Sequence, residues 1–273
     1  MLTFYYYPFT IYVPIGKKLS RVTTMTKLSG KKAIITGATT GIGFATAKQF
    51  IAEGATVIIT GQNRARLVDA AEQLGKKAIA VQTDVRSLTD LDNLAAKAKE
   101  EFDSIDILFA NAGVGQFSPL EQIDEEFYNN QFDINVKGVF FTVQKLSRLL
   151  RPKASVILNA SAVNAKGVAT GSVYFATKAA VRSFARSLAA ELGDRHIRVN
   201  AISPGIVRTE FQSKMNLPKE AVEGFIDAVR QVAPLHRDGE VSEIAKAVTF
   251  LASDDSSYVT ASDLTVDGGY MNV

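Results

Sequence analysis

The chain has 273 residues, enough for one large α/β domain or two small ones. It is 47% hydrophobic and 22% charged, and its net charge of +3 without a long basic run argues against nucleic-acid binding. The absence of cysteine excludes disulfides, thiolate metal sites and cysteine nucleophiles, and the count of only two histidines argues against a histidine-rich metal site.

Residues 1–24 differ from the rest of the chain. They begin with an aromatic-rich stretch that is interrupted by Pro8 and Pro14, is too short to span a bilayer and lacks the features of a signal peptide. Met25 then opens a polar stretch directly before the first predicted strand. We therefore expect 1–24 to be a loosely attached tail or to precede the native start, and 25–273 to be the folded catalytic domain. A peripheral anchor for a membrane or a partner is the alternative, although we expect a cytoplasmic protein without a membrane partner.

Short apolar runs alternate with amphipathic stretches from Lys31 onwards. The nearly continuous apolar character of these runs is typical of strands buried on both faces of a parallel sheet. The predicted strands are 33–36, 56–60, 78–82, 105–110, 155–159, 198–203 and 264–266. The predicted helices are about 42–53, 64–75, 89–102, 124–150, 173–193 and 241–253. This alternation predicts a single α/β domain, a Rossmann-type doubly wound seven-stranded parallel sheet with helices on both faces.

A glycine-rich turn, TGATTGIG at 36–43, joins the first predicted strand to the first predicted helix. Gly37 permits the sharp turn, Gly41 lets the backbone approach a pyrophosphate, and Gly43 lets the helix pack closely on the strand. The helix N-terminus offers free N–H groups to phosphate. No Gly-Lys-Ser/Thr follows, so a P-loop is excluded. The predicted cofactor contacts in this turn are Gly37, Thr39, Thr40, Gly41 and Ile42.

Further candidate cofactor contacts follow the third and fourth predicted strands. Asp84, followed by Val85, offers a carboxylate to an adenine amino group, although a helix-capping role explains an Asp here about equally well. The small backbone of Ala112-Gly113 leaves room for a ribose, while Asn111 is also a common turn former. In a doubly wound sheet the ligand binds where the strand order reverses, between the first and fourth strands.

The end of the second predicted strand bears on the choice between NAD and NADP. It reads Thr60-Gly61-Gln62-Asn63-Arg64 and holds no carboxylate for a ribose 2′-hydroxyl. Arg64 and the amides of Gln62 and Asn63 could hold a 2′-phosphate, so we favour NADP(H) over NAD(H). In the alternative interpretation, Arg64 is a solvated residue in the first turn of the next helix.

The candidate catalytic pair is Tyr174 and Lys178, four residues apart on one face of the predicted helix 173–193. A phenol normally loses its proton near pH 10, and a nearby positive charge lowers that pKa. Ser161, just after the predicted strand 155–159, could hold a carbonyl oxygen against the phenol. Each residue alone has a structural explanation, as a half-buried tyrosine, a solvated lysine or a turn-forming serine. The pattern gains weight from the predicted nucleotide site.

With these residues in view, the chain resembles the short-chain dehydrogenase/reductase family over about 28–270, in its subgroup similar to 3-oxoacyl-acyl-carrier-protein reductases. The shared motifs are Thr36-Gly37-x-x-x-Gly41-Ile42-Gly43, Asp84, Asn111-Ala112-Gly113, Asn135, Ser161, Tyr174-x-x-x-Lys178, Pro204-Gly205 and Val266-Asp267-Gly268-Gly269. The resemblance implies that Tyr174 is the general acid in reduction or the base in oxidation, and that Lys178 lowers its pKa and binds the nicotinamide ribose. It also implies that Ser161 orients the substrate oxygen and that Asn135 holds a water of a proton relay.

The resemblance further implies that the loop starting at Pro204-Gly205 lies beside the nicotinamide. The Val207 backbone and the Thr209 hydroxyl would then bind the carboxamide, and the protein would be a homotetramer. One departure bears on the cofactor, because most NADP-using relatives have a basic residue where this chain has Thr40 or Gln62.

The stretch 209–239 has no predicted strand and follows the carboxyl end of one, so we predict a substrate lid, or alternatively a helical pair packed on the sheet edge. The predicted substrate contacts favour a hydrophobic or mid-sized carbonyl compound over a densely hydroxylated sugar; they are Val114, Phe117, Ser161, Val163, Asn164, Val168, Phe211 and Met215. We predict reversible hydride transfer between a carbonyl and a secondary alcohol by an NADPH-dependent carbonyl or 3-oxoacyl reductase. An NAD-dependent alcohol, hydroxysteroid or sugar dehydrogenase and a nucleotide-sensing protein without turnover are the alternatives.

Overall fold

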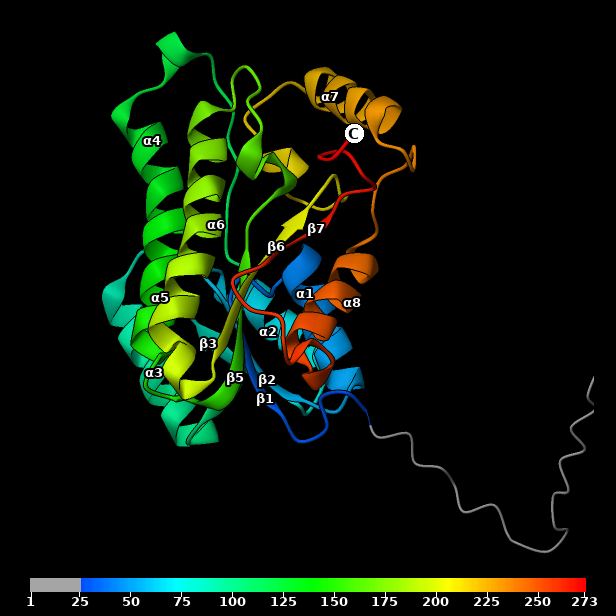
Figure 1. The fold of residues 1–273 in the computed structure, drawn as a ribbon. Helices are drawn as coiled ribbons and strands as arrows, with labels where there is room; N and C mark the ends of the chain where they lie inside the picture. Colours follow the sequence, from blue (N-terminus) through cyan, green and yellow to red (C-terminus); the bar gives the residue numbers. More distant parts are fainter. Residues whose placement is uncertain (1–25) are drawn as a thin grey trace, which may run out of the picture.

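The computed structural model describes residues 26–273, so the predicted tail at 1–24 lies outside the described residues. One seven-stranded sheet runs through the molecule in the order β3-β2-β1-β4-β5-β6-β7 (Figure 1), with every neighbouring pair parallel. The strands are β1 (Lys32–Ile35), β2 (Thr56–Gly61), β3 (Ala78–Gln82), β4 (Ile105–Ala110), β5 (Leu150–Asn159), β6 (Arg198–Pro204) and β7 (Asp263–Val266). This confirms the predicted doubly wound, Rossmann-type single domain.

Helices cover both faces of the sheet, and α7 lies beyond the carboxyl ends of the strands (Figure 1). One face carries α3 (Leu88–Phe102), α4 (Glu125–Phe132), α5 (Gly138–Leu146) and α6 (Ser172–Leu192). The other face carries α1 (Gly41–Ala52), α2 (Arg64–Leu74) and α8 (Val241–Ala252), and α7 spans Lys219–Val232. None of the helices within 26–273 is long and apolar enough to cross a membrane.

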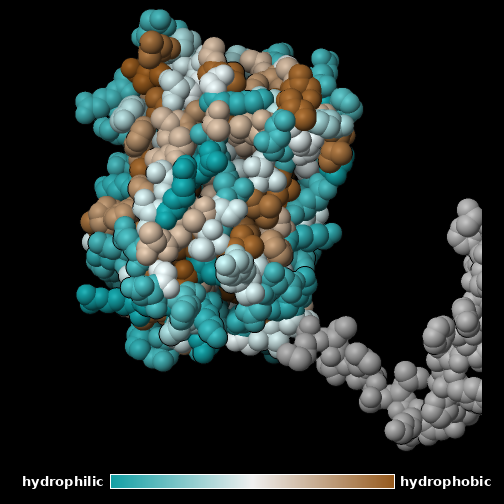
Figure 2. Space-filling model, viewed as in Figure 1, coloured by the Kyte–Doolittle hydropathy of each residue, from teal (hydrophilic) through white to brown (hydrophobic). Residues whose placement is uncertain are grey.

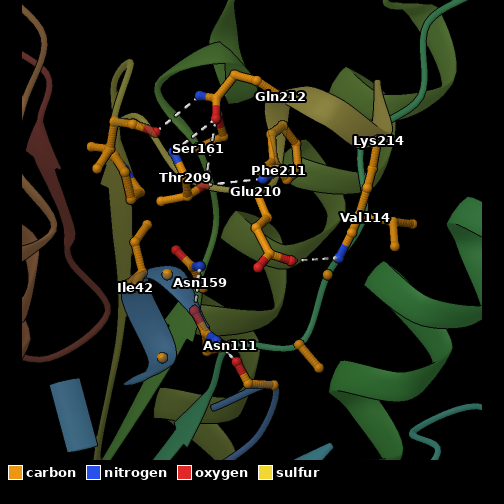
Figure 3. Close-up of a pocket in the computed structure, with 18 of the residues that line it drawn as sticks. Ile42, Asn111, Val114, Asn159, Ser161, Thr209, Glu210, Phe211, Gln212 and Lys214 are labelled. Carbon is orange, nitrogen blue, oxygen red and sulfur yellow. Dashed lines mark hydrogen bonds and ion pairs between the residues drawn. The ribbon is translucent and has the colours of Figure 1, made fainter. Parts of the chain in front are cut away.

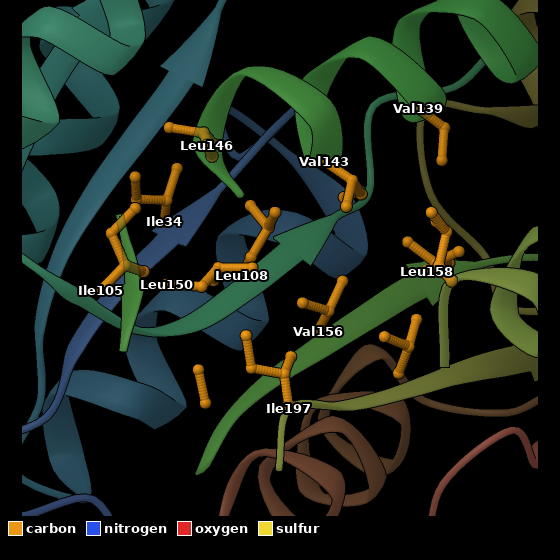
Figure 4. Close-up of a cluster of buried hydrophobic side chains, with 14 of the residues drawn as sticks. Ile34, Ile105, Leu108, Val139, Val143, Leu146, Leu150, Val156, Leu158 and Ile197 are labelled. Carbon is orange, nitrogen blue, oxygen red and sulfur yellow. The ribbon is translucent and has the colours of Figure 1, made fainter. Parts of the chain in front are cut away.

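Successive residues of each central strand enter opposite layers of the core. Ile34, Leu108 and Val156 pack in the cluster under α5 and α6 that Figure 4 shows, with Val143 and Leu146 from α5 above them. The neighbouring strand residues pack in a second cluster against α1 and α8; they include Ile35, Phe109 and Ile157. Both faces of these strands are therefore buried, which explains why their sequences are almost continuously apolar.

The predicted helix 124–150 is interrupted. The chain runs from α4 through a π-helical turn, Asp133–Lys137, into α5, and β5 already begins at Leu150. Insertion of one residue into a helical turn widens it and reorients the side chains, and such turns are frequent at functional sites. The early start of β5 was not predicted from the sequence because its first residues, such as Arg151 and Lys153, are exposed and polar.

The stretch 209–239 folds mainly as α7 with a short 3₁₀ turn, Gln212–Lys214, ahead of it. The buried face of α7, with Val222 and Ile226, packs in a cluster with Phe117, Tyr174 and Met215. Hydrophilic side chains cover much of the lower half of the face in Figure 2, whereas apolar residues are more frequent towards the end where α7 lies. The stretch 209–239, which was predicted to be a lid and is called the lid segment below, therefore packs through α7 against the wall that carries Tyr174.

Candidate active site

The glycine-rich turn between β1 and α1 is shaped by close backbone contacts. Gly37 has a positive φ of 64°, and a Cβ there would lie 2.8 Å from the Ala112 Cα. A Cβ at Gly43 would lie 2.4 Å from the Gly37 carbonyl oxygen. Only glycine fits at these two positions, so the turn forms a tight cradle at the carboxyl end of β1.

Asn111 links the ends of three strands at the floor of the cavity. Its side-chain amide donates to the Thr36 and Gly37 carbonyls at 2.9 and 3.0 Å, and its oxygen accepts from the Asn159 amide at 2.9 Å (Figure 3). Two buried oxygens in this wall, Thr60 Oγ1 and Asn159 Oδ1, have no hydrogen-bond partner among the described residues. The glycine cradle at the start of α1 fits the pyrophosphate of a dinucleotide that passes along the cleft.

The end of β2 and the start of α2 form the side of the cleft where an adenosine ribose is expected. The Asn63 side chain caps α2 by accepting from the Arg66 backbone N–H at 3.0 Å, and Gln62 and Asn63 both line the cavity. Arg66 also lines the cavity, whereas Arg64 does not. Side chains two positions apart on a helix point in directions that differ by about 200°, so only one of these two arginines faces the cleft. The arginine that the sequence interpretation chose is therefore the one turned elsewhere.

Asp84 does not line the cavity, although its neighbour Val85 does. The Asp84 carboxylate accepts from the Arg86 guanidinium at 2.7 Å and from the Gln62 amide at 3.0 Å. The hydrogen bond from Arg86 is the largest cause that holds the pKa of Asp84 below its usual range. The carboxylate expected to accept from an adenine is thus already bound by two side chains beside the cavity.

Ser161, Tyr174 and Lys178 lie together on the cavity wall, where β5 ends and α6 begins. Ser161 lies close enough to Tyr174 to lower the pKa of its phenol, and both residues line the same cavity as the glycine-rich turn. The Lys178 ammonium donates to the Asn159 carbonyl at 2.8 Å and lies 5.8 Å from the centroid of the Tyr174 ring. The three predicted catalytic side chains are therefore brought together, as the sequence pattern required.

Burial dominates the acidity of this pair. It raises the pKa of Tyr174 to about 12, against a smaller lowering by the neighbouring Ser161 hydroxyl. Burial also lowers the pKa of Lys178 to about 8. We expected Lys178 to lower the pKa of the phenol, and the structure differs because desolvation outweighs any such effect and the ammonium is directed to the Asn159 carbonyl. Tyr174 is consequently a phenol that keeps its proton at neutral pH.

Asn135 lies behind the cavity wall, in the π-helical turn, and is fully buried. Its oxygen accepts from the Val114 N–H at 2.9 Å, and its amide donates to the Val114 carbonyl at 2.8 Å and to the Thr177 hydroxyl at 3.0 Å. A Cβ on Gly113 would lie 3.2 Å from the Asn135 oxygen and 3.3 Å from the Lys178 nitrogen. Asn135 thus connects the end of β4 to α6 one residue before Lys178.

The lid segment after β6 enters the cavity through several side chains that the sequence interpretation did not select. The Gln212 side chain accepts from the Thr209 N–H and donates to the Val207 carbonyl, both at 2.9 Å (Figure 3). The Phe211 N–H donates to the Thr209 hydroxyl at 3.1 Å. The available signal was the Thr-x-x-Gln spacing of Thr209 and Gln212, which allows the Gln212 side chain to reach back to the Thr209 N–H.

Glu210 and Phe211 reach the two halves of the cleft from this segment. The Glu210 carboxylate pairs with Arg66 at 2.9 Å and lies 3.8 Å from the Lys214 ammonium (Figure 3). The Phe211 ring lies 5.8 Å from the Tyr174 ring, centroid to centroid, and a Cβ on Gly115 would lie 2.3 Å from its Cζ. The lid is therefore in contact with both the expected ribose end and the tyrosine.

One cavity of about 410 Å³ collects most of the predicted site. Of the predicted cofactor contacts, Arg64 and Asp84 are outside its lining, and of the predicted substrate contacts Asn164 and Val168 are outside. Those that line it are Gly37, Thr39, Thr40, Gly41, Ile42, Gln62, Asn63, Val85, Asn111, Ala112, Gly113, Val114, Phe117, Ser161, Val163, Tyr174, Lys178, Pro204, Gly205, Val207, Thr209, Phe211 and Met215. Asn164 is turned towards other side chains, and Val168 is exposed at 38%.

Comparisons with known proteins agree with this site. The family model described as enoyl-(acyl carrier protein) reductase matches residues 37–271. A solved short-chain dehydrogenase/reductase of Brucella melitensis, titled as a glucose/ribitol dehydrogenase, is 32% identical, covers 90% of this chain and 98% of its own, and superposes with a TM-score of 0.84. The chain belongs to the short-chain dehydrogenase/reductase family.

Two curated relatives illustrate the range of this family. Oxidoreductase asL5 of Sarocladium schorii is 43% identical over 90% of this chain and 98% of its own. The 3alpha-hydroxysteroid dehydrogenase of Mediterraneibacter gnavus is 38% identical over 88% of this chain and 97% of its own. This short-chain dehydrogenase/reductase is accordingly an oxidoreductase that acts on carbonyl or CH–OH groups with a nicotinamide cofactor.

Proposed function

We propose that this enzyme is an NADPH-dependent carbonyl reductase in which Tyr174 donates the proton to the substrate oxygen. The observation that carries the proposal is that Ser161, Tyr174 and Lys178 lie together on the wall of the glycine-rich cleft. A phenol with a pKa of about 12 is almost entirely protonated at neutral pH, which suits an acid better than a base. This protonation state is the one from which Tyr174 donates a proton in carbonyl reduction.

The residues of the site have the following roles in the proposed reaction. The cofactor supplies the hydride when it is bound. Ser161 accepts or donates a hydrogen bond that orients the substrate oxygen, and Tyr174 delivers its proton to that oxygen. Lys178 remains charged below its pKa of about 8 and offers N–H donors to a ribose, and Asn135 fixes the backbone around Val114. The Val207 backbone and Thr209 offer the hydrogen-bonding groups for a carboxamide.

The preference for NADP(H) rests on Arg66 in this proposal, in place of the Arg64 inferred from the sequence. Arg66 lines the cleft at the start of α2, beside Gln62 and Asn63, and the cleft wall there has no carboxylate from β2. Replacement of Arg66 by Leu should weaken NADPH binding by about 10-fold or more, as expected for the loss of a charge-assisted hydrogen bond, and leave NADH binding unchanged. Arg64→Leu is the matched control, and fluorescence titration with both cofactors measures the effect. Equal losses in the two variants would reject Arg66 as the determinant.

An NAD-dependent dehydrogenase is the second candidate, and one contact favours it. The Arg66 guanidinium is already paired with the Glu210 carboxylate at 2.9 Å, which opposes a 2′-phosphate at the same place. A clear preference for NADH in the titration of the wild-type enzyme would support this alternative. Two of the relatives named above carry titles that name a hydroxysteroid or glucose and ribitol, so an alcohol, hydroxysteroid or sugar would then be the substrate to test.

An aromatic or polycyclic ketone is the substrate class that the cavity wall supports best. Phe117, Phe175 and Phe211 surround the Tyr174 ring at centroid distances of 5.7, 6.0 and 5.8 Å. Aromatic rings prefer such offset or tilted neighbours and bury a large apolar area. A comparison of kcat/KM for a bicyclic aromatic ketone and an open-chain keto sugar tests this class. A higher value for the sugar would contradict it.

The replacement Tyr174→Phe tests the catalytic assignment. A positioned acid contributes roughly 10²–10⁴-fold to rate, so the variant should lose turnover by that order. Its affinity for NADPH should stay close to that of the wild type because the ring and Lys178 remain. A near-normal kcat would show that another group supplies the proton.

Assembly into a homotetramer and a cytoplasmic location stay predictions. A groove on the α4–α6 side supports self-association, because its wall is largely aromatic: Phe132, Phe140, Phe141 and Phe184 line it with Val136. Exposed or half-exposed aromatic surfaces of this kind are typical of subunit contacts. Gel filtration at micromolar concentration measures the state, and a single monomer peak would refute the tetramer.

A further inference from the structure

Asn164 lies three residues after Ser161 in the short 3₁₀ turn Ala162–Ala165, and its side chain points away from the cavity. One amide nitrogen donates to the Ser203 hydroxyl at 2.8 Å and to the Asp263 carboxylate at 2.9 Å. Both hydrogens of the amide are thereby used. The Asn164 backbone N–H donates in turn to the Ser161 carbonyl at 3.0 Å. The turn that carries Ser161 is therefore tied to β6 and β7.

Asp263 is the centre of this network. One carboxylate oxygen accepts from the Ser203 hydroxyl at 2.6 Å, and the other accepts from Asn164 and pairs with the Arg182 guanidinium at 3.1 Å. The Asp263 side chain is only 13% exposed, whereas that of Arg182 is 39% exposed. A buried carboxylate with all its partners in place fixes their relative positions more firmly than an exposed one.

Arg182 connects this network to α6, the helix that carries Tyr174. Tyr174, Lys178 and Arg182 are spaced by four residues along α6 and so lie on one face of it. The connection from α6 through Asp263 and Asn164 therefore ends at Ser161, which lies beside Tyr174 on the cavity wall. Each member constrains the separation of the turn at 161–165 from α6.

We propose that Asn164, Asp263 and Arg182 are positioning residues that set the distance between the Ser161 and Tyr174 hydroxyls. None of the three reaches the cavity, so they act on the reaction only through Ser161 and Tyr174. The inference rests on the proposed function for its kinetic consequence, while its structural content concerns only the placement of Ser161 beside Tyr174. A displacement of about 1 Å at a reacting group can reduce rate by about 100-fold.

The test compares Asn164→Leu and Asp263→Asn with a matched control, Asp106→Asn. Asp106 is also a buried carboxylate, 8% exposed in its side chain, that accepts from the Lys32 N–H at 2.9 Å and pairs with Arg151 at 3.1 Å. It is the second residue of β4, towards the end of the strand away from the cavity, and does not line the cavity. All three variants should lose thermal stability, so stability alone does not distinguish them.

Two further measurements distinguish positioning from general stability. We expect kcat to fall by about 10- to 100-fold in Asn164→Leu and Asp263→Asn with KM for NADPH nearly unchanged, and to fall less than twofold in Asp106→Asn. In enzyme without cofactor, labelled with ¹³Cζ-tyrosine, the Tyr174 resonance (assigned from Tyr174→Phe) should shift in the first two variants and not in the control. Should either variant fail to fold, Arg182→Leu, at the half-exposed end of the network, provides the same readouts.

An unchanged Tyr174 resonance in folded Asn164→Leu or Arg182→Leu would overturn the proposal, as would an equal loss of kcat in Asp106→Asn. The resonance does not depend on any substrate. If the wild-type enzyme reduces no carbonyl compound, the proposed function fails, whereas the shift of the resonance still decides whether this network positions the two hydroxyls.

Discussion

The guanidinium of Arg66 and the carboxylate of Glu210 meet at 2.9 Å across the cleft, the first from the start of α2 and the second from the lid segment after β6. Their side chains are 54% and 48% exposed, so solvent weakens the pair, and such surface pairs contribute about 0–1 kcal/mol. The Lys214 ammonium lies 3.8 Å from the same carboxylate oxygen. A negative charge from the lid thus lies beside the cations that face the expected nucleotide site.

Neutralising that charge by Glu210→Gln should strengthen NADPH binding. The carboxylate repels the phosphates of the cofactor and competes for Arg66, so its loss should lower Kd by up to about fivefold, the equivalent of about 1 kcal/mol. The gain should shrink as salt is raised, because exposed charges are screened. Fluorescence titration at 20 and 300 mM salt checks both statements. Weaker NADPH binding at low salt would show that Glu210 supports the cofactor site.

The arginine at position 66 also illustrates what the sequence could not supply. The sequence shows that the end of β2 has no carboxylate residue. It does not show which of two nearby arginines faces the cleft, because that depends on where α2 begins. Asn63 caps the helix, and from there Arg66 faces the cavity while Arg64 turns away. The same holds for Asn164, whose partners are 39 and 99 residues distant in the chain. Local patterns predict periodic elements well and long-range side-chain partners poorly.

Lys178 gives the enzyme a pH dependence with a definite sign. Burial lowers its pKa from 10.5 to about 8, so the ammonium in the folded protein loses its proton as pH rises through about 8. Tyr174 keeps its proton well beyond this point because its pKa is about 12. We expect kcat/KM for carbonyl reduction to fall above about pH 8. Lys178→Arg, whose guanidinium stays charged, should retain its own maximal rate to higher pH. If kcat/KM fell at the same pH in both enzymes, the ionisation of another group would cause the loss of activity.

The same shift has a consequence for stability. Because the pKa of Lys178 is lower in the folded state than in the unfolded state, the unfolded chain binds more protons between about pH 8 and 10.5. The contribution of this residue to the free energy of unfolding should therefore rise with pH over that window. Urea unfolding at pH 7.5, 9 and 10 measures this contribution as the difference in the free energy of unfolding between the wild type and Lys178→Met. A difference that stays constant with pH would mean that the amine is not desolvated.

The buried surroundings of Tyr174 and Lys178 were also beyond the sequence. Four-residue spacing correctly put both side chains on one face of α6, but the sign of the phenol's pKa shift depends on how completely neighbours exclude water. Those neighbours come from four separate places, since Phe117, Phe175, Met215 and Ile226 pack in the cluster around the ring. The prediction of a strand–helix alternation needed no such information, which is why the doubly wound parallel sheet followed from the pattern while the acidity did not.

Gly115 offers a test of the lid. The Phe211 ring lies so close that a Cβ at Gly115 would be 2.3 Å from its Cζ and 3.1 Å from the Tyr174 Cε2, so Gly115→Ala must displace the ring. We expect the ring's displacement to expose the substrate end of the cavity to water, to raise KM for an apolar ketone and to lower kcat by about 10-fold or more.

The matched control for that change is Gly167→Ala. Gly167 also lies in a loop near the site, but a Cβ there meets no atom within 4 Å, and its φ is not in the left-handed region. Its kinetics should match those of the wild type within about twofold, and NADPH binding should be similar in both variants. Steady-state kinetics with one bicyclic ketone, together with NADPH titration, measure these quantities. If Gly115→Ala kept wild-type kcat and KM, the contact of Phe211 with Tyr174 would have no part in turnover, and the lid would act through Glu210 or Gln212 alone.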